Sequence, residues 1–429
     1  MNKAIAICAA VLSIYGASSE ARGEEVLTWE DCVREAAKNH PDLVSAQESV
    51  KSSKADKSIT ASGLFPQVSA DAGASRSGSS GGTSGASSDS KNTNNFNYGV
   101  SGSQLIFDGF QTANKVNAAA ENIKAAQESY RFTSSDVRLR LRTAFVNLMK
   151  AQDAVRIREE IFSRRRQNFE LVTLRYEGGM ENRGSLLTEQ ANVRQAQYDV
   201  TTAKRDIGLA QRQLTKEMGR RELVTMTAKG DFAVNNSARE KPDLVALAEN
   251  HPNLRQATAR MNAAAFNLKS AKGEFFPSVT ANGNAGKSDT RWPPKSDDWS
   301  VGASVSLPIF EGGKRFADIS KADAQLKKAE ADERSARDGI LELLTSAWTA
   351  LQDALDNVDV QKQFLTAGEE RAKITEAQYS IGFVSFNDWI IIEDNLVKAK
   401  NSYLDAQAQA LIAEADWIKA KGETLENVQ

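Results

Sequence analysis

The chain has 429 residues, with 54 Lys and Arg against 56 Asp and Glu and a formal net charge of −2. This balance excludes the basic signature of a nucleic-acid-binding protein and implies no partner of one charge. The length allows two or three ordinary domains or one elongated architecture.

The chain starts with the pattern of a secretory signal peptide. A lysine precedes an apolar run at residues 4–15, and small residues follow it, which is typical of an exported protein. We expect residues 1–23 to be removed, with cleavage between Ala17 and Gly23. Only Cys32 of the two cysteines then remains, and one thiol forms no intramolecular disulfide.

A short phrase with a histidine and a proline occurs twice, as NHPDL at Asn39 and as NHPNL at Asn250. It contains both histidines of the chain, His40 and His251. A metal pair is one interpretation, but a helix-breaking turn is favoured, because proline keeps the residue before it out of helical geometry. The asparagine before each histidine would suit a helix cap.

Two segments with alternating apolar residues follow each phrase, within residues 65–107 and 275–310. In WSVGASVSLPIF, the residues Trp299, Val301, Ala303, Val305, Leu307 and Ile309 share one face, as expected of a strand with one apolar face. Strands of roughly ten residues have the length that a tilted strand needs to cross a bilayer. Between the first pair, a run rich in Ser and Gly at about 76–95 predicts an exposed loop.

A long stretch without proline follows each strand pair. Residues 110–177 contain neither Gly nor Pro, and residues 314–381 are interrupted only by Gly339 and Gly368. At 1.5 Å per residue each helix would be about 100 Å long. Each stretch ends at a glycine turn, YEGGMENRGS or YSIGFVSF, and return helices are expected at 186–217 and 389–421.

The same order of elements in both halves predicts a mainly α fold with a small β part, built by internal duplication. Helices of this length cannot bury a core of their own and must pack as coiled coils against each other or against other subunits. Four strands cannot close a barrel, and a lipid-exposed sheet edge is not tolerated, so a membrane location would require oligomerisation. Tyr98, Trp292 and Trp299 would suit an aromatic girdle at the membrane interface.

The series LTWEDCVREAAKNHPDL, FPQVSADAG, QLIFDG, a long helix and RYEGG, repeated as ALAENHPNL, FPSVTANG, LPIFEGG and YSIG, resembles the TolC family of outer-membrane efflux proteins. The resemblance covers nearly the whole mature chain, from Leu27 to about Lys421. It implies a homotrimer in the outer membrane, in which three protomers with four strands each close a β-barrel of 12 strands. The barrel would continue as an α-helical tunnel through the periplasm.

The resemblance also implies two partners, a periplasmic adaptor (membrane fusion) protein and an inner-membrane transporter, in addition to outer-membrane lipid. The function would be the exit duct of a tripartite efflux or type I secretion system, with no cofactor. Drug, metal and protein exporters share this duct, so the sequence does not indicate the cargo. The chain would comprise a leader (1–23), a first repeat (24–222), an equatorial insertion (223–241), a second repeat (242–421) and a C-terminal tail (422–429).

The helix after the second glycine turn carries, in the family, acidic residues that ring the closed periplasmic entrance. Asp388 matches the first of these positions, whereas the next falls on Ile391 and is lost. Three copies of Asp388 around a trimer axis would concentrate negative charge and favour cations. The alternative is that Ser385 and Asp388 form a capping box that only starts a helix.

Tyr379 matches the family's tyrosine that helps to latch the entrance. The basic latch position falls on Val384 and its acidic partner on Ser185, so a salt-bridge latch is not expected. The entrance is expected to close by packing of Phe383, Phe386 and Trp389. The turns that would contact the adaptor contain Gly178, Gly179, Gly184, Gly382 and Ser385.

Other functional classes find less support. The sequence has no Cys/His cluster, nucleophile elbow or phosphate-binding loop, so we expect neither an enzyme nor a metal site. Arg164–Arg166 would form a solvated helix face rather than a binding patch, and Trp389–Ile392 would pack a hairpin helix. The main alternative is an exported coiled-coil structural or surface protein without a pore, which has no use for amphipathic strand pairs at equal positions of both halves.

Overall fold

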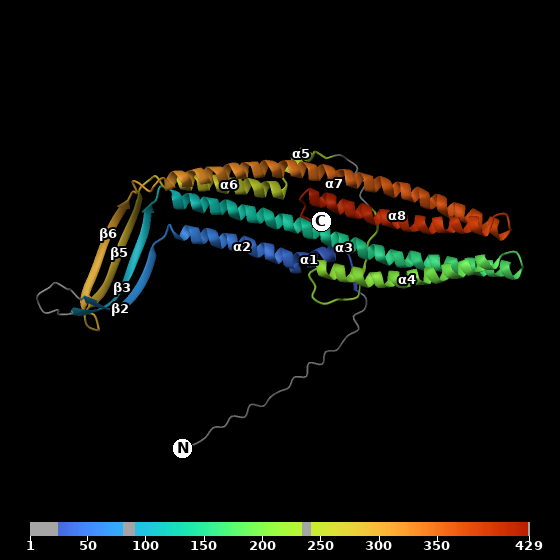
Figure 1. Cartoon of the computed structure of the whole chain (residues 1–429), viewed down its shortest axis with the longest axis horizontal. Coiled ribbons are helices and arrows are strands. Elements are labelled where there is room, and N and C mark those ends of the chain that lie inside the picture. The colour runs from blue at the N-terminus through green and yellow to red at the C-terminus, as the bar shows by residue number, and fades with distance from the viewer. Residues whose placement is uncertain (1–24, 80–90, 234–241, 428–429) are drawn as a thin grey trace, which may run out of the picture.

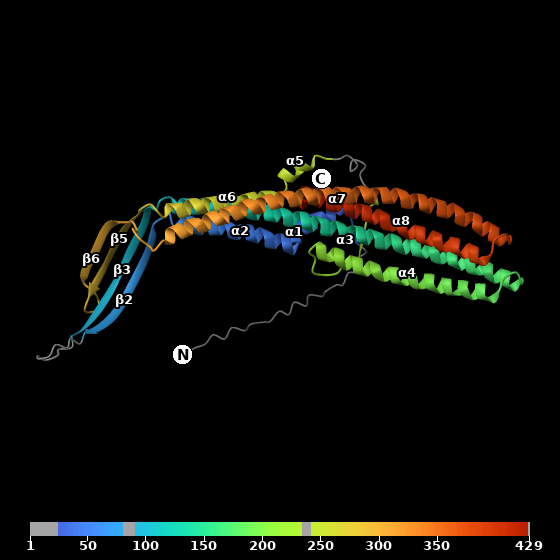
Figure 2. The ribbon, with the colours of Figure 1, turned by 45° about the horizontal axis from the view of Figure 1, so that its top comes forward.

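The computed structural model describes residues 25–79, 91–233 and 242–427 of the chain. The molecule is elongated, with four strands at one end and the turns of two long helical hairpins at the other (Figure 1). A view turned by 45° shows the same arrangement, with both hairpin turns far from the sheet (Figure 2). The expected leader and the centre of the Ser- and Gly-rich loop lie outside the described residues.

Two halves with the same order of elements make up the described chain. The first half contains α1 (Trp29–Asn39), α2 (Pro41–Ser62), β2 (Gln67–Ser79), β3 (Lys91–Phe107), α3 (Gln111–Glu177) and α4 (Arg183–Glu217). The second half contains α5 (Leu244–Glu249), α6 (Pro252–Gly273), β5 (Ser278–Asp289), β6 (Ser296–Ser306), α7 (Lys314–Ser380) and α8 (Phe386–Ala420). Two short strands pair in parallel: β1 (Glu25–Leu27), which precedes α1, and β4 (Met226–Ala228), which lies in the segment between the halves.

The helices α3 and α7 each run unbroken for 67 residues. Gly339 and Gly368 lie inside α7 without ending it, since a glycine costs a helix only about 1 kcal/mol. Beside the sheet α3 packs with α2 and α6, and α7 packs with α6. Beyond the middle α4 packs on α3, and α8 packs on both α3 and α7. The two long helices therefore connect the sheet to the distant turns (Figure 1).

His40 and His251 lie at corners between helices, as the prolines predict, but the histidines themselves are the caps. His40 Nδ1 accepts a hydrogen bond from the amide of Asp42 at 3.2 Å, and His251 makes the equivalent contact at 3.2 Å. The expectation of asparagine caps holds only for Asn250, the C-cap of α5, whereas Asn39 is the last residue of α1. Neither asparagine caps the start of the following helix, because the histidine ring nitrogen already reaches the free amide. Both rings are buried, and the described residues contain no group of metal-ligating side chains.

The strands β2, β3, β5 and β6 form one antiparallel sheet in that order. The register places Val68, Ala70, Tyr98, Val100, Val279, Ala281, Ala285, Trp299, Val301, Ala303 and Val305 on one face. The other face consists mainly of Ser, Asn, Thr and Gly and also carries Asp71 and Asp298, with cross-strand contacts such as Ser69 Oγ to Ser101 Oγ at 2.9 Å. Leu307 and Ile309, expected on the apolar face, lie beyond the end of β6 at Ser306.

The three girdle candidates lie in the outer part of this sheet. Tyr98 and Trp299 are on its apolar face, and Trp292, in the β5–β6 turn, packs edge-on against Phe96 with ring centroids 6.2 Å apart. All three side chains are exposed in the single chain. None of the described helices has the length and apolar composition needed to cross a membrane.

The middle of the molecule has the largest apolar core, formed by α1, α3, α4 and β4. Cys32 is completely buried in it, and burial raises the pKa of its thiol to about 12. The C-terminal turn adds Leu425 to the same core. The core thus holds both chain ends of the described structure against α3.

Candidate functional site at the helical tip

The turns α3–α4 (178–182) and α7–α8 (381–385) together form the end of the molecule that we call the tip (Figures 1 and 2). Gly179 and Gly382 have φ of 70° and 85°, a conformation that glycine adopts without strain. The next amide in each turn bonds back to the helix, from Met180 to Arg175 at 2.8 Å and from Phe383 to Gln378 at 2.9 Å. This is the Schellman helix ending, built identically in both halves.

Side-chain caps start both return helices earlier than expected. Asn182 accepts a hydrogen bond from the amide of Ser185 at 3.0 Å, and Ser385 accepts one from the amide of Asp388 at 3.3 Å. Helix α4 therefore begins at Arg183 and α8 at Phe386. Gly184, expected in the turn beside Gly178, lies instead in the first turn of α4, because the cap precedes it.

Asp388 is exposed, and its carboxylate accepts a hydrogen bond from Ser385 Oγ at 2.6 Å. The contact joins the side chains of the cap and of the third helical residue. A capping role and a role at the entrance remain compatible, since the carboxylate keeps its exposure.

An aromatic cluster joins the two hairpins just above the turns. Tyr379 and Trp389 are fully buried and stack at 4.3 Å with an interplanar angle of 10°. Phe386 packs edge-on against both rings, and Val172 of α3 completes the cluster. Phe383, expected in this packing, is 81% exposed, because the left-handed glycine before it directs it away from the helices.

Polar contacts around Tyr379 join the two turns through partners that the sequence did not predict. The Tyr379 hydroxyl donates to Glu181 Oε2 at 3.0 Å, and the Arg175 guanidinium lies 4.7 Å from the ring centroid. Arg175 Nη1 also donates to the carbonyls of Tyr379 at 2.9 Å and Ser380 at 3.3 Å. Burial and the neighbouring carboxylate raise the pKa of Tyr379 above its usual value.

The positions of the family's ionic latch fall on Val384 and Ser185, which carry no charge, so no salt bridge was expected at this end of the molecule. The charges are present nearby, on Arg175 and Glu181 at either side of the first glycine turn. A search for charged residues around both turns could have found them, but only the fold shows that both contact Tyr379.

A charged contact between α3 and α8 lies farther from the tip than the aromatic cluster, and we call this contact the seam. Arg164 Nε and Nη2 donate to Glu393 at 2.6 and 2.8 Å, and Nη2 donates to Glu376 of α7 at 3.1 Å. Arg165 pairs with Asp394, and its Nη1 lies 3.7 Å from Glu189 of α4. The two arginines thus connect four helices.

The expectation of a solvated Arg164–Arg166 face was therefore wrong for two of its three residues. Arg165 is 6% exposed, and its partner Glu189 is fully buried. Burial raises the pKa of the Glu189 carboxyl. Only Arg166 is exposed.

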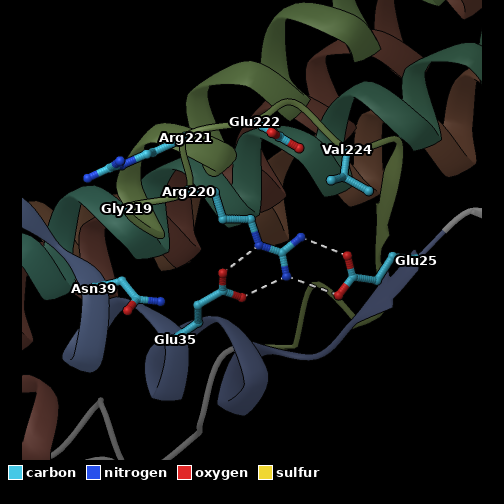
Figure 3. Close-up of a pocket in the computed structure, with 8 residues that line it drawn as sticks. All are labelled: Glu25, Glu35, Asn39, Gly219, Arg220, Arg221, Glu222 and Val224. Atoms are coloured by element: carbon cyan, nitrogen blue, oxygen red, sulfur yellow. Dashed lines mark hydrogen bonds and ion pairs between the residues drawn. The ribbon is translucent and has the colours of Figure 1, made fainter. Parts of the chain in front are cut away.

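A second charged cluster lines an open pocket of about 710 Å³ at the middle of the molecule (Figure 3). Arg220 bonds to both oxygens of Glu25, at 2.7 and 3.0 Å, and to both of Glu35, at 2.5 and 2.7 Å. Its guanidinium lies between the two carboxylates (Figure 3), which raise its pKa. The cluster holds strand β1 against α1. Because two carboxylates already bind the Arg220 guanidinium, its positive charge is not available to a ligand.

Comparisons with known proteins agree with this architecture. A family model described as outer membrane efflux protein matches residues 32–220 and 244–423. The outer membrane efflux protein BepC of Brucella suis biovar 1 (strain 1330) is 22% identical over 98% of this chain and 90% of its own length. The cation efflux system protein CusC of Escherichia coli (strain K12) is 22% identical over 91% of this chain and 85% of its own.

Among solved structures, the open state of the Neisseria gonorrhoeae MtrE outer membrane channel has a similar fold. It superposes with a TM-score of 0.79 at 19% sequence identity, over 92% of this chain and 89% of that one.

Proposed function

Since this chain belongs to the outer membrane efflux protein family, we propose that it forms the outer-membrane exit duct of a tripartite efflux or type I secretion system. Three protomers would each contribute β2, β3, β5 and β6 to one barrel, and their helices would form the tunnel through the periplasm. A periplasmic adaptor and an inner-membrane transporter would deliver the cargo. No reaction is catalysed.

The two-faced sheet is the observation that carries this proposal. Its outer strands, β2 and β6, each pair on one side only within the protomer, and such edges are not stable in lipid. Closure through copies of the chain satisfies both edges. The apolar face then contacts lipid and the polar face lines the lumen.

The proposal predicts a trimer that conducts ions. Sedimentation of the detergent-purified protein should give three times the mass of the mature chain, and the protein should form channels in planar bilayers. A natively folded monomer that forms no channel would overturn the proposal. An exported coiled-coil protein, the alternative, would also be extracted from membranes by high salt and alkali.

The tip would close the periplasmic entrance, with the contacts around Tyr379 holding α7 and α8 against α3. A hydrogen bond to a charged acceptor contributes about 1.5–3 kcal/mol, so Tyr379→Phe should shift the closed–open ratio about tenfold or more toward open. The control is Tyr176→Phe, which changes the equivalent and 38% exposed tyrosine of the first half. Equal open probability of both variants in planar bilayers would contradict a latch.

Asp388 would contribute negative charge at this entrance. Asp388→Asn should then lower the cation selectivity of single channels while leaving trimer stability nearly unchanged. If selectivity is unaltered and stability falls by about 1 kcal/mol, as for a lost cap, Asp388 only starts α8.

The tip would also meet the adaptor, through turns whose exposed residues include Met180 (64%) and Phe383 (81%). Cysteines at these two positions should crosslink to the adaptor and resist labelling from the cell exterior. They replace neither cap, so α4 and α8 keep their starts. Labelling of either cysteine on intact cells would contradict the proposed orientation, in which the tip lies in the periplasm.

A further inference from the structure

One cross-strand row on the polar face of the sheet contains two aspartates and two glycines. Asp71 of β2 pairs with Gly99 of β3, Gly99 with Gly286 of β5, and Gly286 with Asp298 of β6. Directly paired residues project to the same face. Both carboxylates therefore lie on the face that lines the lumen in the proposed trimer, one on each outer strand of the protomer.

The two glycines between them have no room for a side chain. A Cβ on Gly286 would lie 2.6 Å from the carbonyl oxygen of Tyr98, and a Cβ on Gly99 would lie 3.1 Å from the Cα of Gly286. The backbones of β3 and β5 approach closely here, so nothing in the row stands between the carboxylates. Both aspartates are exposed to the lumen side.

No opposite charge accompanies these carboxylates on their face. Among the described residues 67–78, 93–107, 278–289 and 296–306, the lumen face carries Gln, Ser, Thr, Asn, Gly and Leu105 besides the two aspartates. Asn97 Nδ2 donates to Asp71 Oδ2 at 3.3 Å, which orients the carboxylate without neutralising it.

On the opposite face of the sheet, the neighbouring aspartate is paired with a lysine. Asp297 pairs with Lys287 across β5 and β6, with Oδ1 3.0 Å from Nζ. Successive residues of a strand point to opposite faces, so Asp297 and Asp298 are neighbours in sequence but lie on opposite sides of the sheet. The lipid-side charge is thus compensated, whereas the lumen-side charge is not.

We propose that Asp71 and Asp298 make the barrel lumen selective for cations over anions. The inference rests on the proposed trimeric duct, in which each aspartate occurs three times around the axis. Because Asp71 and Asp298 lie in one row across the sheet, their copies line the same stretch of the exit path. Fixed charges of one sign in a narrow aqueous passage raise the local concentration of the opposite ion. Cationic solutes would pass these carboxylates more readily than polyanions.

The test is the reversal potential of reconstituted full-length channels in KCl gradients. The double variant Asp71→Asn/Asp298→Asn keeps side-chain size and hydrogen bonding, and it should lower the ratio of K⁺ to Cl⁻ permeability about threefold or more. The effect should be larger at 0.01 M than at 0.1 M salt, because the Debye length falls from about 30 to about 10 Å. Asp297→Asn is the matched control and should leave the ratio unchanged.

Each outcome separates this inference from the proposed function. The role of the lumen carboxylates would be overturned if the double variant left the permeability ratio unchanged, or if Asp297→Asn altered the ratio equally. Neither result would contradict the proposed duct. If Asp388→Asn alone abolishes selectivity and the double variant does not alter it, selectivity lies at the entrance and the inference fails. Absence of channels from the unmodified protein would refute the duct itself.

Discussion

Removal of the Glu393 carboxylate should loosen α8 from α3 along the seam. Glu393 is 1% exposed and accepts two hydrogen bonds from Arg164, at 2.6 and 2.8 Å, and one from Asn168 at 3.4 Å. In Glu393→Ala, Arg164 loses its buried partner. Of the carboxylates to which it donates in the described part of the chain, Glu376 remains, and its side chain is 47% exposed.

The expected cost follows from these contacts. Breaking a buried ion pair costs about 3–5 kcal/mol when the remaining charge stays buried. The Arg164 side chain is 32% exposed and can move toward water, so we expect about 2 kcal/mol, below that range. Since 1.4 kcal/mol is a factor of ten, local opening should increase about 30-fold.

Hydrogen exchange of the α8 amides near Glu393, measured on the native trimer, reports this local opening. Protection should fall about 30-fold in Glu393→Ala. The control, Asp323→Ala, removes an exposed pair with Lys327 on α7, which contributes about 0.5 kcal/mol or less, so protection should change about twofold at most. In the double variant Arg164→Ala/Glu393→Ala the losses should not add, because both residues make the same interaction.

Additive losses in the double variant, or unchanged protection in Glu393→Ala, would refute the assignment of the seam as the contact that holds the hairpins together. The first result would mean that the two residues act independently. The second would mean that the aromatic cluster beside the turns already determines the stability of this region.

Three further predictions concern stability. Gly109→Ala should prevent normal assembly, since φ is 68° and a Cβ would lie 2.3 Å from the carbonyl oxygen of Gly273. The control Gly312→Ala, at the equivalent position of the second half, meets no atom within 4 Å and should cost about 1 kcal/mol of strain. The amount of heat-resistant trimer on gels distinguishes the two variants. Leu425→Ala should lower trimer stability by about 2–5 kcal/mol, measured as the melting temperature, because this side chain is 1% exposed; an unchanged value would mean that the C-terminal turn is dispensable. Burial lowers the pKa of His251 to about 4, below its ordinary 6.5. The stability that the neutral ring contributes to the folded protein is therefore present above pH 6.5 and is lost as pH falls toward 4, by an amount of order 3 kcal/mol. His251→Asn, which can still cap α6, should remove this part of the acid sensitivity in melting curves at pH 7 and 5.

Much of the fold could be predicted because it depends on local chemistry. The stretches without Gly or Pro form α3 and α7, and the glycine turns end them where the left-handed conformation is needed. The alternation in β6 predicted its apolar face, since side chains of a strand alternate between faces. The duplication then extended each prediction from one half to the other.

The candidate site was only partly predictable, because its contacts join residues far apart in the chain. Tyr379 was identified by resemblance, but its partners Arg175 and Glu181 are separated from it by 204 and 198 residues. Phe383 was misplaced because a turn residue can point to either side, and its direction depends on the glycine before it.

Sequence alone determined the lengths of the two long helices α3 and α7, the apolar faces of the strands and the presence of the glycine turns, since these follow from residues within a few positions of each other. Tertiary structure alone decided which charges are paired. Arg164, Arg165 and Arg166 are consecutive, and each points about 100° around the helix from the one before. Two of them meet acidic residues of α8 and the third meets solvent, because the rotation of α3 against its neighbours is set by the packing of the whole bundle.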